Sequence, residues 1–401
     1  MAHPHRLAIE GQNLMNLGNE KFIQKLKDDC VEFAQRLIQT PSMPGEEQAV
    51  ADLIYNEMKA LQFDEVWIDE VGNACGRIFG DDRQLPAVVL NTHLDHVDPG
   101  DPALWSISPY SGAIVDGRIV GRGASDIKGP LAVQVYSMAG LKRLERRPNR
   151  DVVFTGVVEE EVGGAGALHW IKNLDYPVAL IILGEPSSNE LSLGHRGMLA
   201  MWITFRGRSV HASVPQKGDN PNYALADFLT RLRTAQSQLS AHPLLGATTV
   251  APTIVEVDTK SQNVTPAWSR VLLDFRTSSE SPRSLNQFVE RVAAEIPHNI
   301  SAGYVNVPVT DSDELITGFY TPPESRAVQK VRALLAEGMG RKPQLVSYRF
   351  ATDGRHFTDR DIPMVGFSPG DEAQAHIADE SISIELMEES LRAHLYLLAN
   401  Y

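Results

Sequence analysis

Short apolar runs alternate with helical stretches along most of this chain, and several of the runs lead into a side chain that can bind a metal ion. Runs such as AVVLNTH and VALIILG are typical of buried strands, and PLAVQVYSMAGLKRLERR between them has the apolar spacing of a helix. The alternation predicts an α/β fold with a mixed, largely parallel sheet and helices on both faces. The metal-binding side chains that follow the runs are His93, Asp126, Glu160, Glu161, Glu185 and His376.

These side chains are expected to share one pocket. In open α/β sheets, ligands bind just beyond the carboxyl ends of the strands, where residues distant in sequence meet. Two histidines with several carboxylates suit zinc, which needs no cysteine. If Asp126 bridges two ions, His93 and Glu185 complete the ligands of one ion. Glu161 and His376 then complete the ligands of the other. Each ion keeps an open position for water, which is the catalytic arrangement.

The chain should form two domains. Its 401 residues exceed the length at which a single core usually stops growing. Near Gly194 the pattern changes to strands such as MLAMWITFRG and SRVLLDFRT, with a long helical stretch at NYALADFLTRLRTAQSQL. We therefore predict a smaller α+β lid domain at residues 197–310, inserted into a catalytic domain formed by residues 1–196 and 311–401.

Charge and cysteine content narrow the class of protein. The formal net charge is −14 and the chain has no basic run, which argues against a nucleic-acid partner. The two cysteines, Cys30 and Cys75, exclude a disulfide framework and fit a reducing compartment. The first residues lack an apolar core of signal-peptide length, and no later segment is apolar enough to span a bilayer. These features indicate a cytoplasmic protein without a membrane partner.

Five segments together resemble a known enzyme family. HLDHVDPG, GRGASDIKG, EEEVGGAGA, LGEPS and AHIADE occur in the order and rough spacing found in acetylornithine deacetylase, succinyl-diaminopimelate desuccinylase, aminoacylase and glutamate carboxypeptidase. The resemblance covers nearly the whole chain. It implies an α/β catalytic domain interrupted by an α+β lid, and hydrolysis of an amide in a small acylated amino acid or peptide. It also implies a cis peptide bond after Asp126.

The resemblance assigns the metal ligands and a general base. The positions that correspond to ligands of two Zn²⁺ ions, with Asp126 shared, are His93, Asp126, Glu161, Glu185 and His376. Co²⁺ or Mn²⁺ could replace zinc in such a site. Glu160 corresponds to the general base, and a carboxylate next to a ligand is well placed to move a proton from water to the leaving nitrogen. If the run is extended, Glu160 points away from Glu159 and Glu161.

Two further residues correspond to catalytic positions. Asp95 lies two residues past His93 and resembles the acid that orients the ligand histidine; the alternative is an ordinary loop aspartate. His211, in RGRSVHASVP, resembles the histidine that stabilises the tetrahedral intermediate, often across a dimer. A histidine on a β surface is otherwise usually just a satisfied polar residue. The resemblance thus implies a homodimer assembled through the lid domain.

Four residues are candidates for binding the substrate. Asn263 in QNVTP and Arg276 in LLDFRT match lid positions that hold the substrate's polar backbone and carboxylate. Guanidinium binds a carboxylate through two parallel hydrogen bonds, but a surface ion pair between Arg276 and Asp274 is the alternative. ATDGRHF resembles the TDGR segment of deacetylases and desuccinylases, so Gly354 and Arg355 are expected to line the pocket unless this is a plain Asp-Gly turn.

The leading hypothesis is a di-zinc amidohydrolase that deacylates a small N-acyl amino acid. A dipeptidase or carboxypeptidase would share the same metal centre, because substrate choice depends on pocket shape and lid contacts. The TDGR segment favours deacylation. An inactive metal-binding or assembly protein of the same fold would be expected to have lost a ligand or the base, and all of these residues are present.

Overall fold

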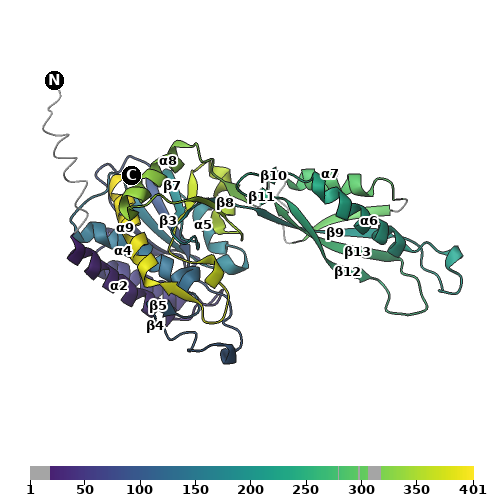
Figure 1. Ribbon diagram of the computed structural model, residues 1–401, viewed down its shortest axis with the longest axis horizontal. Coiled ribbons are helices and arrows are strands. Elements are labelled where there is room, and N and C mark those ends of the chain that lie inside the picture. Colours follow the sequence, from purple (N-terminus) through teal and green to yellow (C-terminus); the bar gives the residue numbers. More distant parts are fainter. Residues whose placement is uncertain (1–18, 279, 297–298, 306–317) are drawn as a thin grey trace, which may run out of the picture. The chain divides into compact units, whose positions relative to one another are not determined.

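The computed structural model describes residues 19–278, 280–296, 299–305 and 318–401 (Figure 1). Contacts divide the chain into two compact units. The first takes the residues up to Gly194 together with Tyr320–Val346 and Thr352–Tyr401, and the second takes His195–Phe319 with Ser347–Ala351. The predicted boundary at residue 310 falls in 306–317, outside the described residues.

The first unit is built on a mixed sheet. Eight of its nine described strands follow the order β1-β2-β6-β3-β7-β17-β8-β15, and the ninth, β16, pairs with β8. The central strands β6, β3, β7 and β17 are parallel, whereas β1–β2, β2–β6 and β17–β8 pair antiparallel. The strands are β1 (Glu65–Ile68), β2 (Ala74–Ile78), β3 (Ala87–His93), β6 (Val152–Val157), β7 (Val178–Leu183), β8 (Leu191–His195), β15 (Phe319–Tyr320), β16 (Leu345–Tyr348) and β17 (Met364–Gly366).

Helices cover both faces of this sheet. Every residue of β3 and β6 is buried, which requires cover on either side and confirms the predicted α/β architecture. Helix α4 is buried almost all round, because α2 and α9 pack against it as well as the sheet. The helices are α2 (Glu20–Ile38), α3 (Gln48–Ala60), α4 (Gly129–Arg143), α5 (Ala165–Lys172), α8 (Arg326–Met339) and α9 (Ile384–Asn400). Among the described residues, none of the helices has the length and apolar character needed to cross a bilayer.

The run before Asp126 begins in a strand of a separate small sheet, not in a strand of the main sheet as expected. Antiparallel strands β4 (Ala113–Val115), β5 (Arg118–Val120) and β18 (Ser381–Ser383) form it, in the order β18-β5-β4. The run IVGRGAS therefore does not belong to the main sheet. It leaves β5 at Val120 and turns at Gly123, whose φ of 80° favours glycine. Asp126 then lies in a π-helical turn that leads directly into α4.

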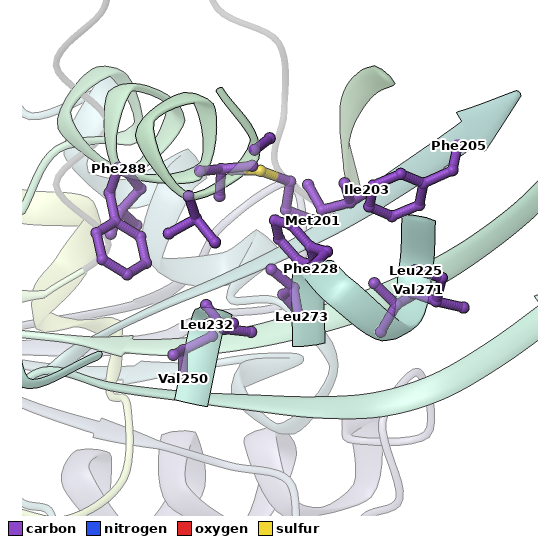
Figure 2. Packing of buried hydrophobic residues seen from close by; sticks show 14 of the residues in the cluster. Met201, Ile203, Phe205, Leu225, Phe228, Leu232, Val250, Val271, Leu273 and Phe288 are labelled. Carbon is purple, nitrogen blue, oxygen red and sulfur yellow. The ribbon is translucent and has the colours of Figure 1, made fainter. Parts of the chain in front are cut away.

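The second unit is an α+β structure with its own core. Its sheet follows the order β12-β13-β9-β14, antiparallel throughout, with helices α6 (Pro221–Ala235) and α7 (Pro282–Ala293). Buried residues alternate with partly exposed ones along β9 and β13, so helices cover one face only. Figure 2 shows Phe205, Phe228 and Phe288 in this core. The strands are β9 (Gly197–Arg206), β12 (Thr249–Val257), β13 (Trp268–Thr277) and β14 (Asn299–Val305), with a hairpin of β10 (Ala241–His242) and β11 (Gly246–Ala247).

Candidate metal centre

The four parallel strands at the centre of the main sheet lead into the candidate site. His93 is the last residue of β3, and a 3₁₀ turn that contains Glu160 and Glu161 follows β6. Glu185 follows β7, and His376 lies in the loop after β17. The carboxyl ends of parallel neighbours lie at the same edge of a sheet. His93 and His376, which are nearly 300 residues apart in the sequence, thereby belong to one cluster.

Asp126 lies between the two histidines of the cluster. Its Oδ1 is 3.1 Å from Nε2 of His93, and its Oδ2 is 3.3 Å from Nε2 of His376. His376 Nε2 is also 3.0 Å from Oε1 of Glu161. One donor atom each from His93, Asp126 and Glu161 falls within 4.8 Å of the others. The peptide bond between Asp126 and Ile127 is cis, as the resemblance led us to expect.

The electrostatics of the cluster favour a bound cation. The carboxylates of Asp126 and Glu161 raise the pKa of His376 to about 10. Burial raises the pKa of the Glu185 carboxyl well above its usual value, and although His93 opposes this, the charge of Asp126 adds to it. Buried carboxylates are unfavourable unless a positive charge is paired with them. Two imidazoles with three carboxylates are a donor set that fits zinc and related divalent ions.

Asp95 connects His93 to the acidic turn. His93 Nδ1 lies 3.2 Å from Oδ1 of Asp95 and 3.1 Å from its carbonyl oxygen. The same carboxylate accepts hydrogen bonds from the backbone N–H groups of Glu160, at 3.2 Å, and Glu161, at 3.0 Å. Asp95 is completely buried. Its side chain therefore fixes the ring of one candidate ligand and the backbone of the neighbouring turn at once.

The acidic run is not extended, so the expected strand-like alternation of its side chains is wrong. Strand β6 ends at Val157, and Glu159 has a left-handed backbone with φ of 59°. Glu160 and Glu161 follow in the 3₁₀ turn. Burial raises the pKa of Glu160 well above its ordinary value, and the negative charge of Asp353 adds to the effect. The side chain of Glu160 thus has the character of a carboxylate that readily takes a proton.

Two buried acids near the cluster were not identified from the sequence. Asp353 precedes the predicted pocket residues Gly354 and Arg355, and burial raises its pKa to about 7. Glu380 accepts hydrogen bonds from Arg122 Nη1 at 2.6 Å and from the backbone of Asp126 at 3.0 Å. The signals were present, since Asp353 belongs to TDGR and Glu380 ends AHIADE. Gly354 is buried, and Arg355 Nε donates to His356 Nε2 at 3.1 Å.

The three candidates in the second unit have local partners there. His211 pairs with Val264 in an isolated bridge, and its Nδ1 lies 2.7 Å from Oγ of Ser213. The backbone carbonyl of Asn263 accepts a hydrogen bond from the N–H of Ala212 at 2.8 Å. Arg276 Nε is 2.8 Å from Oδ1 of Asp274, so the ion pair considered as an alternative is present.

Comparison with known proteins decides the family. Residues 89–400 match Peptidase family M20/M25/M40. The chain belongs to this family. Like its other members, the protein is a metal-dependent hydrolase, as the residues of the cluster led us to expect.

Relatives match this M20 family protein over most of their length. Succinyl-diaminopimelate desuccinylase of Cereibacter sphaeroides is 28% identical, and the match spans 93% of this chain and 99% of that relative. The uncharacterized protein YgeY of Escherichia coli is also 28% identical, over 91% of this chain and 93% of its own.

Solved structures of the family share the fold. Aminopeptidase PepT from Bacillus cereus has a TM-score of 0.74 at 19% identity, with 93% of this chain and 98% of that chain covered. YXEP from Bacillus subtilis, described as a dinuclear metal binding peptidase, has a TM-score of 0.69 at 14% identity, with 93% and 98% covered.

Proposed function

We propose that this M20 family hydrolase uses two Zn²⁺ ions to cleave the amide bond of a small N-acyl amino acid. The observation that carries the proposal is the position of Asp126, whose two carboxylate oxygens each face a different histidine. A carboxylate in that position suits a bridge between two ions. His93 and Glu185 would complete the ligands of one ion, and Glu161 and His376 those of the other. Co²⁺ or Mn²⁺ would suit the same donors.

Divalent ions, when bound, would polarise the amide carbonyl and lower the pKa of water. Glu160 would accept a proton from the attacking water and pass it to the leaving nitrogen, and its raised pKa suits both transfers. Asp95 would hold the His93 ring and the Glu160 backbone at a fixed spacing. His211 would donate a hydrogen bond to the oxyanion that forms on the former carbonyl oxygen.

Four residues are proposed to bind the substrate. Gly354 and Arg355 would line the pocket beside Asp353. Asn263 would bind the polar backbone of the substrate. Arg276 would exchange its present partner Asp274 for the substrate carboxylate, which a half-exposed ion pair allows because such pairs are weak.

Deacylation is the favoured reaction because the desuccinylase relative aligns over nearly its full length and TDGR is present. Hydrolysis of dipeptides, or removal of a carboxyl-terminal residue, is the alternative, supported by a dipeptidase and a carboxypeptidase structure of the same fold. The third possibility, an inactive metal-binding or assembly protein, is opposed by the candidate ligands that remain around Asp126, namely His93, His376 and Glu161.

A substrate screen tests this proposal. Protein loaded with Zn²⁺, Co²⁺ or Mn²⁺ is offered N-acetyl, N-succinyl and N-formyl amino acids and dipeptides, and amine release is measured. We expect at least one acyl class to be cleaved with a kcat/KM about tenfold or more above any dipeptide, a difference of roughly 1.4 kcal/mol in transition-state binding. A preference for dipeptides would support the peptidase alternative. Metal-loaded protein that cleaves nothing would support the inactive one.

We also propose that the protein forms a homodimer through the second unit. Strand β12 pairs with β13 along one side and stands at the end of the sheet among the described strands. Its residues Ile254, Val255 and Val257 are exposed, Val255 by 56%. An apolar edge strand with unpaired backbone groups favours pairing with another chain. A second copy would cover it and bring His211 to the partner's site.

Mixing two inactive variants tests the shared site. His211→Ala lacks the oxyanion donor and Glu160→Ala lacks the base, so each alone should be nearly inactive while it keeps its metal. After equal mixing and full exchange, half of the dimers are mixed and one of their two sites is intact, so about a quarter of wild-type activity should return. Subunit exchange is verified with two affinity tags. No recovery after proven exchange would mean that each chain uses its own His211 or that this histidine is structural.

We further propose a cytoplasmic location. Cys30 and Cys75 are both buried and unpaired, which suits a reducing compartment. The expected partner is a small acylated amino acid or peptide. The net charge of −14 and the absence of a basic run support the expectation that neither nucleic acid nor a membrane is bound.

A further inference from the structure

The turn that carries Glu160 and Glu161 is held through its backbone by side chains from elsewhere in the chain. Four consecutive N–H groups, those of residues 158–161, each donate to a side-chain oxygen. The acceptors are Asn73 Oδ1 for Val158 at 3.0 Å, Glu47 Oε1 for Glu159 at 3.1 Å, and the two Asp95 oxygens for Glu160 at 3.2 Å and Glu161 at 3.0 Å.

These side-chain acceptors bond to backbone N–H groups that have no neighbouring strand to pair with. Strand β6 ends at Val157, and the first N–H groups of a helical turn lack backbone acceptors. Buried N–H groups need partners, and here each receives one that is itself buried. Asn73 and Asp95 are fully buried, and Glu47 is 4% exposed. Carboxylates are rarely placed in such surroundings unless hydrogen bonds stabilise them.

Glu47 bonds through its carboxylate to the backbone of the acidic turn as well as to backbone groups beside it, those of Gly45 and of Glu47 itself. It occupies the N-cap position of α3, where a side chain usually caps the first turn, but it makes no such capping hydrogen bond within the described part of the chain. Its Oε1 instead reaches Glu159, more than a hundred residues away in sequence. Glu159 has the left-handed backbone that starts the turn, a conformation uncommon for residues other than glycine.

Asn73 fixes the other end of the same segment. Its Nδ2 donates to Asp69 Oδ2 at 2.8 Å and to the carbonyl of Gly166 at 3.0 Å, which directs its Oδ1 at Val158. A Cβ at Gly166 would lie 2.3 Å from that Oδ1. Glycine is therefore required at this close approach. Asn73 thus ties residue 158 to residue 166, on either side of Glu160.

We propose that Glu47 and Asn73 are positioning residues for Glu160. Their hydrogen bonds to the acidic turn go to backbone N–H groups, those of Val158 and Glu159, and they act by holding the backbone from which the Glu160 side chain projects. Asp95 differs, because it also contacts the ring of His93. The inference rests on the proposed role of Glu160 as the general base. A displacement of about 1 Å in a reacting group can lower turnover roughly 10²-fold.

Substitution of Glu47 separates positioning from other roles. Glu47→Ala removes the acceptor for Glu159, so kcat should fall about 10–100-fold while KM changes less than about twofold and bound metal is unchanged. Glu47→Gln keeps an oxygen acceptor and should stay within about threefold of the wild type. Glu46→Ala, which changes the exposed neighbouring acid, is the matched control and should have no effect.

A double variant shows whether Glu47 acts through Glu160. Adding Glu47→Ala to Glu160→Ala should produce no further loss of the residual activity, because the group being positioned is already absent. An equal loss in both backgrounds, or a Glu47→Gln variant as impaired as Glu47→Ala, would overturn the proposal in favour of a general structural role. Loss of metal from Glu47→Ala would overturn it as well.

Hydrogen exchange gives a measurement that does not depend on the reaction. Mass spectrometry of the peptide that spans residues 158–161 should show exchange about tenfold or more faster in Glu47→Ala, and unchanged exchange in Glu47→Gln and Glu46→Ala. Unchanged exchange in Glu47→Ala would overturn the positioning role, whatever reaction the site performs. A wild-type protein without any amidase activity would contradict the proposed function instead, and the exchange result would still decide whether Glu47 holds the turn.

Discussion

Asp126→Asn should lose most of its bound metal and nearly all of its turnover. The asparagine side chain keeps one oxygen but replaces the other with an NH₂ group, so it cannot accept an ion on both sides. Its neutral amide also leaves the cluster with less negative charge. Because changes in the outer residues of metal sites lower metal affinity by about 10–100-fold, loss of a shared ligand should lower it by at least that much. Metal analysis after dialysis measures the loss.

Asp98→Asn is the matched control for this experiment. Asp98 lies in the neighbouring loop, is exposed, and accepts a hydrogen bond from the N–H of Gly100. The control should retain metal and activity. If Asp126→Asn still bound two ions per chain, Asp126 would not be a shared ligand, and the two sets of ligands proposed above would be wrong.

Glu160→Ala should leave the bound metal intact and lower turnover by roughly 10²–10⁴, the usual contribution of general acid–base catalysis. Glu161→Ala should instead reduce bound metal, because the Glu161 carboxylate lies beside His376. The two measurements, metal content and turnover, therefore separate adjacent residues of the same turn.

Glu159→Ala provides the control within the same run. Its backbone N–H, which is the group bonded to Glu47, is kept. Turnover and metal content should both stay within about threefold of the wild type, as for a substitution outside the reacting groups. If the effects of Glu160→Ala and Glu161→Ala were exchanged, the assignment of base and ligand would be displaced by one residue.

The sequence predicted the parts of the site that depend on local pattern. His93 ends β3 and Glu185 follows β7, and both runs form central strands, with β3 buried throughout and β7 buried from Leu180 to Leu183. It could not place Asp126, because nothing in IVGRGAS shows that β5 ends at Val120 and pairs in a separate small sheet. The sequence did not indicate strand β16 either, because this strand forms by pairing with β8, which is distant in sequence.

The conformation of the acidic turn also depends on distant residues. The acceptors that hold residues 158–161 come from Glu47, Asn73 and Asp95, which lie 65 to 112 positions away in the chain. Nothing within EEEVGGAGA specifies those partners. Alternation alone therefore predicts an extended run, whereas the long-range hydrogen bonds hold these residues in a turn.

The order of strands in the main sheet has a consequence for synthesis of the chain. β7 and β8 are consecutive in sequence, but β17, made almost two hundred residues later, lies between them. The sheet therefore cannot be completed until β17 has been made, whereas the core residues of the second unit, from Leu199 to Ile296, are all made before β17. His376 and Glu380 emerge later still. The first unit starts before the second in sequence but can be completed only after it, and a partial chain that ends before residue 376 lacks one of the candidate metal ligands.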